Sequence, residues 1–213
     1  MARDSHTPRN RLGDPLAKQS GRRCLREEIA YRAARLIAED GLTDFAAAKQ
    51  KAARQMGVTE KGALPDNHEI EVALKTHQSL FQRDTQPQEC RALREIAVDV
   101  MRRLQRFSPW LVGNVLSGSA NRFSPIELEI VADDAKQLEM FFLNEGVPFE
   151  TRVTRAPRAV DDADNISIYE LSVMEIPVVI SLYPHHNVRF TRRPRKSRAH
   201  ARAQLKDIEL LLV

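Results

Sequence analysis

The chain has 213 residues, of which 42% are hydrophobic, and it carries 33 Lys/Arg against 29 Asp/Glu, for a net charge of +4. This length and composition suit one domain of ordinary size or one domain with a helical extension. The two cysteines, Cys24 and Cys90, are far apart and do not suggest a disulfide framework or a cysteine metal site. The first residues are basic without an apolar stretch and no segment approaches a membrane span, so we expect a cytoplasmic protein with no membrane partner.

Charge is distributed unevenly along the chain. Residues 1–23 contain six Lys/Arg and two Asp, and residues 189–206 contain eight Lys/Arg and no acidic residue. We therefore expect 1–23 to be a disordered basic N-terminus and 185–213 to be a basic C-terminal tail around a mildly acidic body. Such a tail is either solvated or contacts the phosphates of a nucleic acid.

Apolar residues at helical spacing predict four helices in the first half. Gly41 is suited to end the first, and Thr43 or Asp44 to cap the second. Asp66 and Glu69 form a capping-box pattern for the third. The predicted helices cover 24–40, 44–56, 66–81 and 87–107, and the first three define a helical region at 24–87.

A helix-turn-helix is an alternative interpretation of residues 52–58, where small residues precede a Gly-Val pair. Its recognition helix should begin near Thr59, but Gly62 and Pro65 interrupt the residues that follow. We therefore do not expect this segment to read DNA.

After Pro109 the hydrophobic period becomes that of strands. The predicted strands are 110–116, 126–132, 148–154, 166–174 and 176–183, with a helix at 133–145 and an exposed loop at 155–165. The last two strands suggest a hairpin that turns at Glu175. The fold class expected is α+β, a mixed sheet with flanking helices preceded by an N-terminal helical region.

Residues 113–130, GNVLSGSANRFSPIELEI, are the most informative segment. Alternation places Glu127 and Glu129 on one face of a strand whose apolar residues face the other way. Two carboxylates on one face indicate a metal site or an ordinary solvated face. Gly113 and Gly118 bracket a turn where bare backbone can approach a phosphate.

This segment resembles the signature of the minimal nucleotidyltransferases of the DNA polymerase beta superfamily. That signature reads Gly-Ser, three residues, Gly, one residue, Ala, three residues and Ser-Asp-Ile-Asp-Leu-Asp. The positions that match by identity are Gly113, Gly118, Ala120, Ser124, Ile126 and Leu128, and the two metal-binding acids, Glu127 and Glu129, match in kind. The departures are Asn114 for Ser, Pro125 for Asp, and Glu in place of both Asp, which lengthens each arm by roughly 1.5 Å.

The resemblance implies a nucleotidyltransferase-like domain at 88–184 that aligns a nucleoside triphosphate with an acceptor hydroxyl by two Mg²⁺ ions, with Mn²⁺ as the alternative. The residues implied to bind the nucleotide are Gly113, Asn114, Gly118 and Ser124. Glu127 and Glu129 are the implied catalytic metal ligands. A third carboxylate is expected near Val179, which is apolar, so Glu170 on the neighbouring strand is the candidate substitute. Glu175 is the alternative unless it lies in the hairpin turn.

Three further groups are candidates for the same site. Arg122 and Arg152 either meet a triphosphate or are rim charges, and His185 and His186 lie after the last strand, where adjacent side chains diverge. Each has an ordinary surface interpretation.

Two functions are therefore expected. The first is an enzyme that transfers a nucleoside monophosphate from an NTP to a hydroxyl of a protein, an RNA or a small molecule. The alternative is a catalytically inactive nucleotide- or RNA-binding module of the same fold. Glu170 distinguishes them: a carboxylate within about 5 to 6 Å of Glu127 and Glu129 favours activity, and one that points to solvent favours the binding module.

Overall fold

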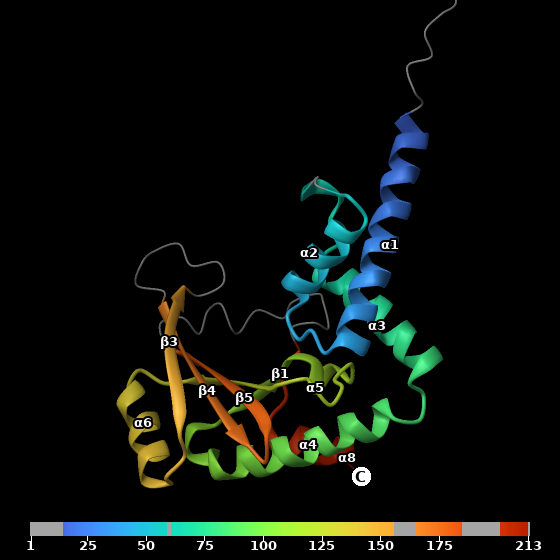
Figure 1. The fold of residues 1–213 in the computed structure, drawn as a ribbon. Coiled ribbons are helices and arrows are strands. Elements are labelled where there is room, and N and C mark those ends of the chain that lie inside the picture. The colour runs from blue at the N-terminus through green and yellow to red at the C-terminus, as the bar shows by residue number, and fades with distance from the viewer. Residues whose placement is uncertain (1–14, 59–60, 156–164, 185–200, 213) are drawn as a thin grey trace, which may run out of the picture.

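The structure of the chain is a computed structural model that describes residues 15–58, 61–155, 165–184 and 201–212 (Figure 1). Its α-helices are α1 (Pro15–Asp40), α2 (Phe45–Gln55), α3 (Asn67–Phe81), α4 (Gln86–Arg103), α5 (Gly113–Ser117), α6 (Ala135–Asn144) and α8 (Leu205–Leu212). Its strands are β1 (Trp110–Val112), β2 (Ile126–Val131), β3 (Phe149–Arg155), β4 (Asn165–Val173) and β5 (Ile176–Tyr183). Two short 3₁₀ turns are η1 (Lys61–Ala63) and η2 (Gln105–Phe107).

Helices α1, α2 and α3 pack together beside the sheet (Figure 1). Their buried residues are small or aliphatic and include Ile29, Ala33, Ala48, Ala52, Ile70 and Leu74. Asp44 caps α2 by accepting a hydrogen bond from the Ala46 N–H at 2.8 Å. Asp66 and Glu69 form the predicted capping box of α3. The helical region predicted at 24–87 is therefore present, with its first helix longer than expected.

The first helix begins at Pro15, inside the segment that was predicted to be disordered. Proline is tolerated in a first helical turn because its missing N–H would have no intrahelical partner there. The prediction of disorder was wrong for residues 15–23, and residues 1–14 lie outside the described part of the chain.

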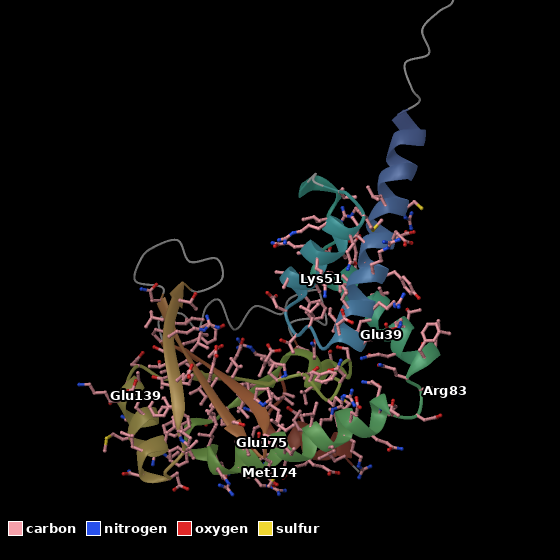
Figure 2. All side chains as sticks on the ribbon, in the orientation of Figure 1. Glu39, Lys51, Arg83, Glu139, Met174 and Glu175 are labelled. Atoms are coloured by element: carbon pink, nitrogen blue, oxygen red, sulfur yellow. The ribbon has the colours of Figure 1, made fainter. Side chains whose placement is uncertain are left out.

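The five strands form one mixed sheet in the order β1-β2-β5-β4-β3. Strands β2 and β5 are parallel, and the other neighbours are antiparallel. The predicted hairpin of β4 and β5 turns at Met174 and Glu175, which both have positive φ, as a two-residue type I′ turn requires (Figure 2). The predicted α+β class, with a mixed sheet and a preceding helical region, is confirmed.

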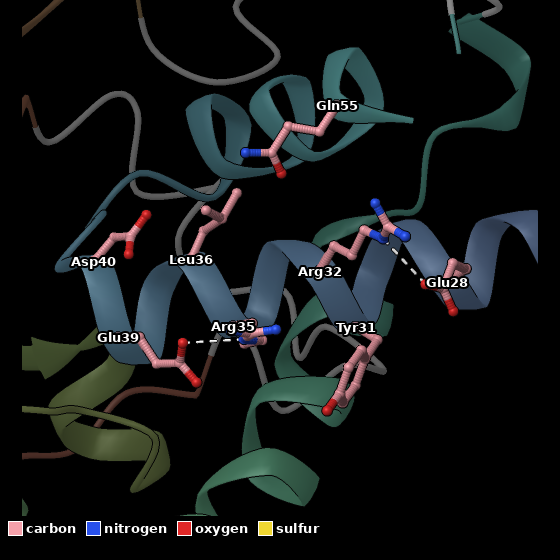
Figure 3. A pocket seen from close by; sticks show the side chains of 8 residues that line it. All are labelled: Glu28, Tyr31, Arg32, Arg35, Leu36, Glu39, Asp40 and Gln55. Carbon is pink, nitrogen blue, oxygen red and sulfur yellow. Dashed lines mark hydrogen bonds and ion pairs between the residues drawn. The ribbon is translucent and has the colours of Figure 1, made fainter. Parts of the chain in front are cut away.

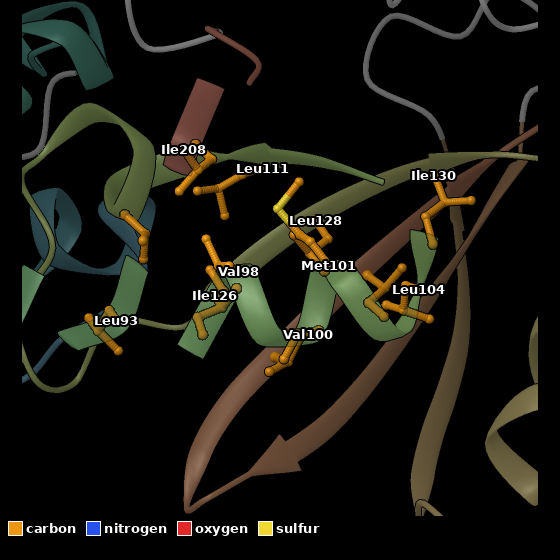
Figure 4. Packing of buried hydrophobic residues seen from close by; sticks show 14 of the residues in the cluster. Leu93, Val98, Val100, Met101, Leu104, Leu111, Ile126, Leu128, Ile130 and Ile208 are labelled. Carbon is orange, nitrogen blue, oxygen red and sulfur yellow. The ribbon is translucent and has the colours of Figure 1, made fainter. Parts of the chain in front are cut away.

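Helices α4 and α6 cover one face of this sheet. Three alternate residues of β2 are almost fully buried on that face: Ile126, Leu128 and Ile130. Met101 of α4 lies among them (Figure 4), and the ring of Phe142 in α6 is 6.0 Å from that of Tyr169 in β4. The opposite face of β2 carries the odd-numbered residues, which are half-buried.

The strand predicted at 110–116 is wrong after its third residue. Gly113 has φ +72°, which ends β1, and the next residues form the short helix α5. An apolar run such as Trp110 to Leu116 fits either type of element, so the hydrophobic pattern alone did not locate the change.

The end of the chain also departs from the prediction of a basic tail. Leu111 and Ala203 exchange backbone hydrogen bonds of 2.9 and 3.1 Å, so residue 203 lies along the outer edge of β1. Helix α8 then packs on α4, where Arg102 pairs with Glu209 at 2.8 Å and Ile208 is fully buried. Residues 201–212 are thus part of the folded body, and we call them the C-terminal strap. Across the part of the chain that is described, no helix combines the length and apolar character needed to cross a membrane.

Candidate functional site

Glu127 and Glu129 lie on the same face of β2, as predicted, and both are half-buried. Glu127 is in register with Val112 of β1 and Val179 of β5, and Glu129 is in register with Ser181 of β5. The two carboxylates therefore share one side of the sheet with residues of both neighbouring strands, while the residues between them pack into the core.

The Gly113 turn lies directly against Glu127. A Cβ atom placed on Gly113 would be 2.5 Å from Oε1 of Glu127, closer than any real Cβ contact. The positive φ of Gly113 also favours glycine over any other residue. The positive φ is thus the constraint that favours glycine here, and any other residue would also require the Glu127 carboxylate to move.

The other predicted nucleotide-binding residues hold the turn itself. The backbone carbonyl of Asn114 accepts hydrogen bonds from the N–H groups of Gly118, Ser119 and Ala120 at 3.0 to 3.1 Å. Ser124 is buried, and its hydroxyl accepts from the Asn121 N–H at 3.0 Å. In this structure these residues shape the loop between α5 and β2, and the Ser124 hydroxyl is enclosed by protein.

Side-chain amides from the helical half fasten the same loop. Gln78 of α3 donates to the carbonyl of Ser119 at 2.9 Å, and Gln86 of α4 donates to those of Gly118 and Ala120 at 2.9 and 2.8 Å. Asn121 in return donates to the carbonyl of Ile37 in α1 at 3.0 Å. Residues 24–87, which matched no part of the motif, therefore position the motif loop.

Arg202 is a residue of the candidate site that the sequence did not indicate. It forms an ion pair with Glu129, and both side chains are largely shielded from water, at 22% and 18% exposure. The strap carries Arg202 to this position because Ala203 pairs with the edge of β1. Arg202 belongs to a basic stretch that composition marks as a tail, and a single sequence offers no signal that separates it from its neighbours.

Glu170 does not join the acidic pair. It is in register with Val179, and thus two strands away from Glu127, and its carboxylate pairs with Arg152 at 2.9 Å on an exposed surface. Val179 occupies the position expected for a third acid. Among the described residues, no group of three His, Cys, Asp or Glu side chains is placed to hold a metal ion.

The electrostatic state of Glu127 differs from that of Glu129. Burial, and to a lesser degree the charge of Glu129, raises the pKa of the Glu127 carboxyl above its ordinary value. Glu127 makes no ion pair with a described residue, whereas Glu129 has Arg202. Among the described residues the site therefore offers one carboxylate without a counter-charge and one that is already neutralised, which suits a single cation and does not suit two.

The other candidate residues do not reach the site. The guanidinium of Arg122 lies 4.6 Å from the ring centre of Phe123, and Arg152 is held by Glu170. His185 and His186 lie outside the described residues, as does the basic stretch 185–200.

Several hollows of the described surface lie elsewhere. One of about 470 Å³ runs along α1, where Arg32 pairs with Glu28 and Arg35 with Glu39, so its charges neutralise each other (Figure 3). A more apolar one of about 630 Å³ lies between α4, α6 and the β4–β5 hairpin. Neither contains a residue of the predicted site.

Comparison of the chain with protein-family models, with curated proteins and with solved structures found no match. The function must therefore be argued from the site itself.

Proposed function

We propose that this chain is a catalytically inactive nucleotide-binding protein of nucleotidyltransferase-like architecture. The observation that carries the proposal is the contact between the Gly113 turn and Glu127, next to a Glu129 that Arg202 already neutralises. Bare backbone beside a carboxylate suits a nucleotide that arrives with one divalent cation. Transfer needs a second ion, and Val179 stands where the ligand for that ion is expected.

Each residue then has a distinct part in binding. Glu127 is the ligand of the single cation, because it has no competing counter-charge among the described residues. Gly113 presents bare backbone at the turn, and Arg202 neutralises Glu129, so the phosphates do not meet a second uncompensated carboxylate. The amides of Gln78 and Gln86 keep the loop in place before the nucleotide binds.

The test is calorimetric titration of the full chain with ATP, CTP, GTP and UTP, each with Mn²⁺. We expect binding of at least one nucleotide with one Mn²⁺ per chain, and a loss of about tenfold or more in affinity for Glu127→Gln, the equivalent of ~1.4 kcal/mol. Glu170→Gln is the matched control, because Glu170 lies on the same face but pairs with Arg152. Absence of binding by all four nucleotides contradicts the proposal.

Transfer of a nucleoside monophosphate is the second candidate. The observation in its favour is that Glu127 and Glu129 share one face beside the Gly113 turn, as the resemblance implies. Incubation with radiolabelled NTP, Mg²⁺ or Mn²⁺ and cell extract tests it. Label transfer that disappears in both Glu127→Gln and Glu170→Gln would show that a third carboxylate takes part, and the enzyme would replace the binding protein.

A further inference from the structure

The two edge strands of the sheet differ in whether another described segment pairs with them. The outer edge of β1 is covered by the strap, through the paired hydrogen bonds of Leu111 and Ala203. Strand β3 is the other edge, and no described residue pairs with its outer side. An edge strand of seven residues presents a row of N–H and C=O groups to which another strand can bind. Edge strands often carry charged side chains that prevent pairing with another chain, so the charges of β3 determine which strand can pair with it.

The charges on β3 are unbalanced within one chain. Glu150 is directly opposite Glu170 in the ladder, and it makes no ion pair with a described residue. Arg152, two positions along on the same face, is diagonal to Glu170 and pairs with it at 2.9 Å. Like charges directly opposite each other destabilise a ladder, so Glu150 lacks a counter-charge that a neighbouring strand could supply.

The sequence of β3 is complementary to itself when two copies lie antiparallel, with Thr151 of one copy opposite Thr151 of the other. In that register Glu150 of each copy lies opposite Arg152 of the other, on one face of the sheet. On the other face, Phe149 lies opposite Val153, which is 68% exposed in the single chain. Registers centred on Glu150 or on Arg152 instead place two like charges opposite each other.

We propose that β3 pairs antiparallel with β3 of a second copy of this chain, in the register centred on Thr151, to make a two-fold dimer with one continuous sheet. The alternating charges exclude the neighbouring registers and the apolar pair closes the face beside α6. Phe142 of α6 packs against Phe149, with ring centres 5.3 Å apart, so this face is already apolar in the single chain. The proposal is independent of the nucleotide site.

Sedimentation of the full chain over a dilution series tests the dimer. We expect a reversible monomer–dimer equilibrium for the natural sequence. Glu150→Arg and Arg152→Glu should each raise the dimer Kd by about tenfold, because each change makes two rows of like charge. Arg91→Glu, an exposed change on α4, is the control and should leave the Kd unchanged.

The decisive experiment mixes the two charge-reversed variants, Glu150→Arg and Arg152→Glu. In the register centred on Thr151, the arginine introduced at position 150 of the first variant faces the glutamate introduced at position 152 of the second. The natural Arg152 of the first and the natural Glu150 of the second also face each other, so a mixed dimer should form with roughly the original Kd. A loss of stability in either variant cannot produce this rescue. A natural chain that stays monomeric, variants that dimerise unchanged, or a mixture that stays monomeric each overturn the proposal.

Discussion

The face of the sheet that packs on α4 and α6 and the face that carries Glu127 are built from alternate residues of the same strands, yet they are stabilised in different ways. The packed face gains from apolar area, and many aliphatic side chains share that role. On the other face ion pairs join some of the charged side chains, Glu129 to Arg202 and Glu170 to Arg152, while Glu127 makes no ion pair with a described residue. The comparison shows that a two-residue period determines which side chains share a face, while the groups they meet there come from distant parts of the chain.

The largest expected effect comes from the packed face. Leu128 is 1% exposed, so Leu128→Ala leaves a cavity and should lower the free energy of unfolding by about 2 to 5 kcal/mol. Val179→Ala, on the other face of the adjacent strand, is the control and should cost less, because that side chain is only partly buried. Urea unfolding measures both. Equal losses of unfolding free energy in the two variants would contradict the view that the two faces of the sheet are stabilised in different ways.

Gly113→Ala should have an intermediate effect, of about 1 to 3 kcal/mol, because it adds a strained positive φ to a clash with Glu127. The double variant Gly113→Ala with Glu127→Ala separates the two causes. Removal of the carboxylate relieves the clash and leaves the backbone strain, so the double variant should unfold less easily than the sum of the single changes predicts. Simple additivity in urea unfolding would show that the turn does not press on Glu127.

The smallest effect concerns the charge of Glu127. Its raised pKa means that the folded state keeps a proton that the unfolded state releases, so the free energy of unfolding falls as pH rises above the ordinary value of 4.5 and through the raised value. Glu127→Gln removes this dependence.

We therefore expect Glu127→Gln to have the same free energy of unfolding as the natural chain at acidic pH and a higher one near neutral pH. Urea unfolding at a series of pH values measures the difference. Glu170→Gln should show no such gain, because Glu170 is exposed and paired with Arg152. If Glu127→Gln is no more stable than the natural chain at any pH, the carboxylate is not penalised by burial.

Local signals predicted much of the fold. The capping residues Asp44 and Asp66 and the alternation of Ile126, Leu128 and Ile130 each act within a few residues, and the structure has the predicted helices and the predicted face. They also placed Glu127 and Glu129 together. These features need no knowledge of where other segments lie.

Long-range contacts were not predictable in this way. Arg202 reaches Glu129 only because Ala203 pairs with β1, and the same basic residues elsewhere would be a solvated tail. One local signal was overlooked: Leu205, Ile208 and Leu212 recur at helical spacing and indicate α8. The position of Glu170 depended on the register of β4, which hydrophobic alternation alone does not specify.

The amide contacts to the motif loop also bear on how the chain folds as it is synthesised. Helix α1 leaves the ribosome early, yet the carbonyl of Ile37 near its end accepts a hydrogen bond from Asn121, which is synthesised much later. The side chain of Gln78 in α3 likewise donates to the carbonyl of Ser119, which follows it by 41 residues. Contacts of such wide sequence separation slow folding, since a long loop must close before they form. The contacts that fasten the ends of α1 and α3 therefore form only after residues 119–121 have been synthesised, so a nascent chain that ends before residue 121 should stay sensitive to protease at the end of α1.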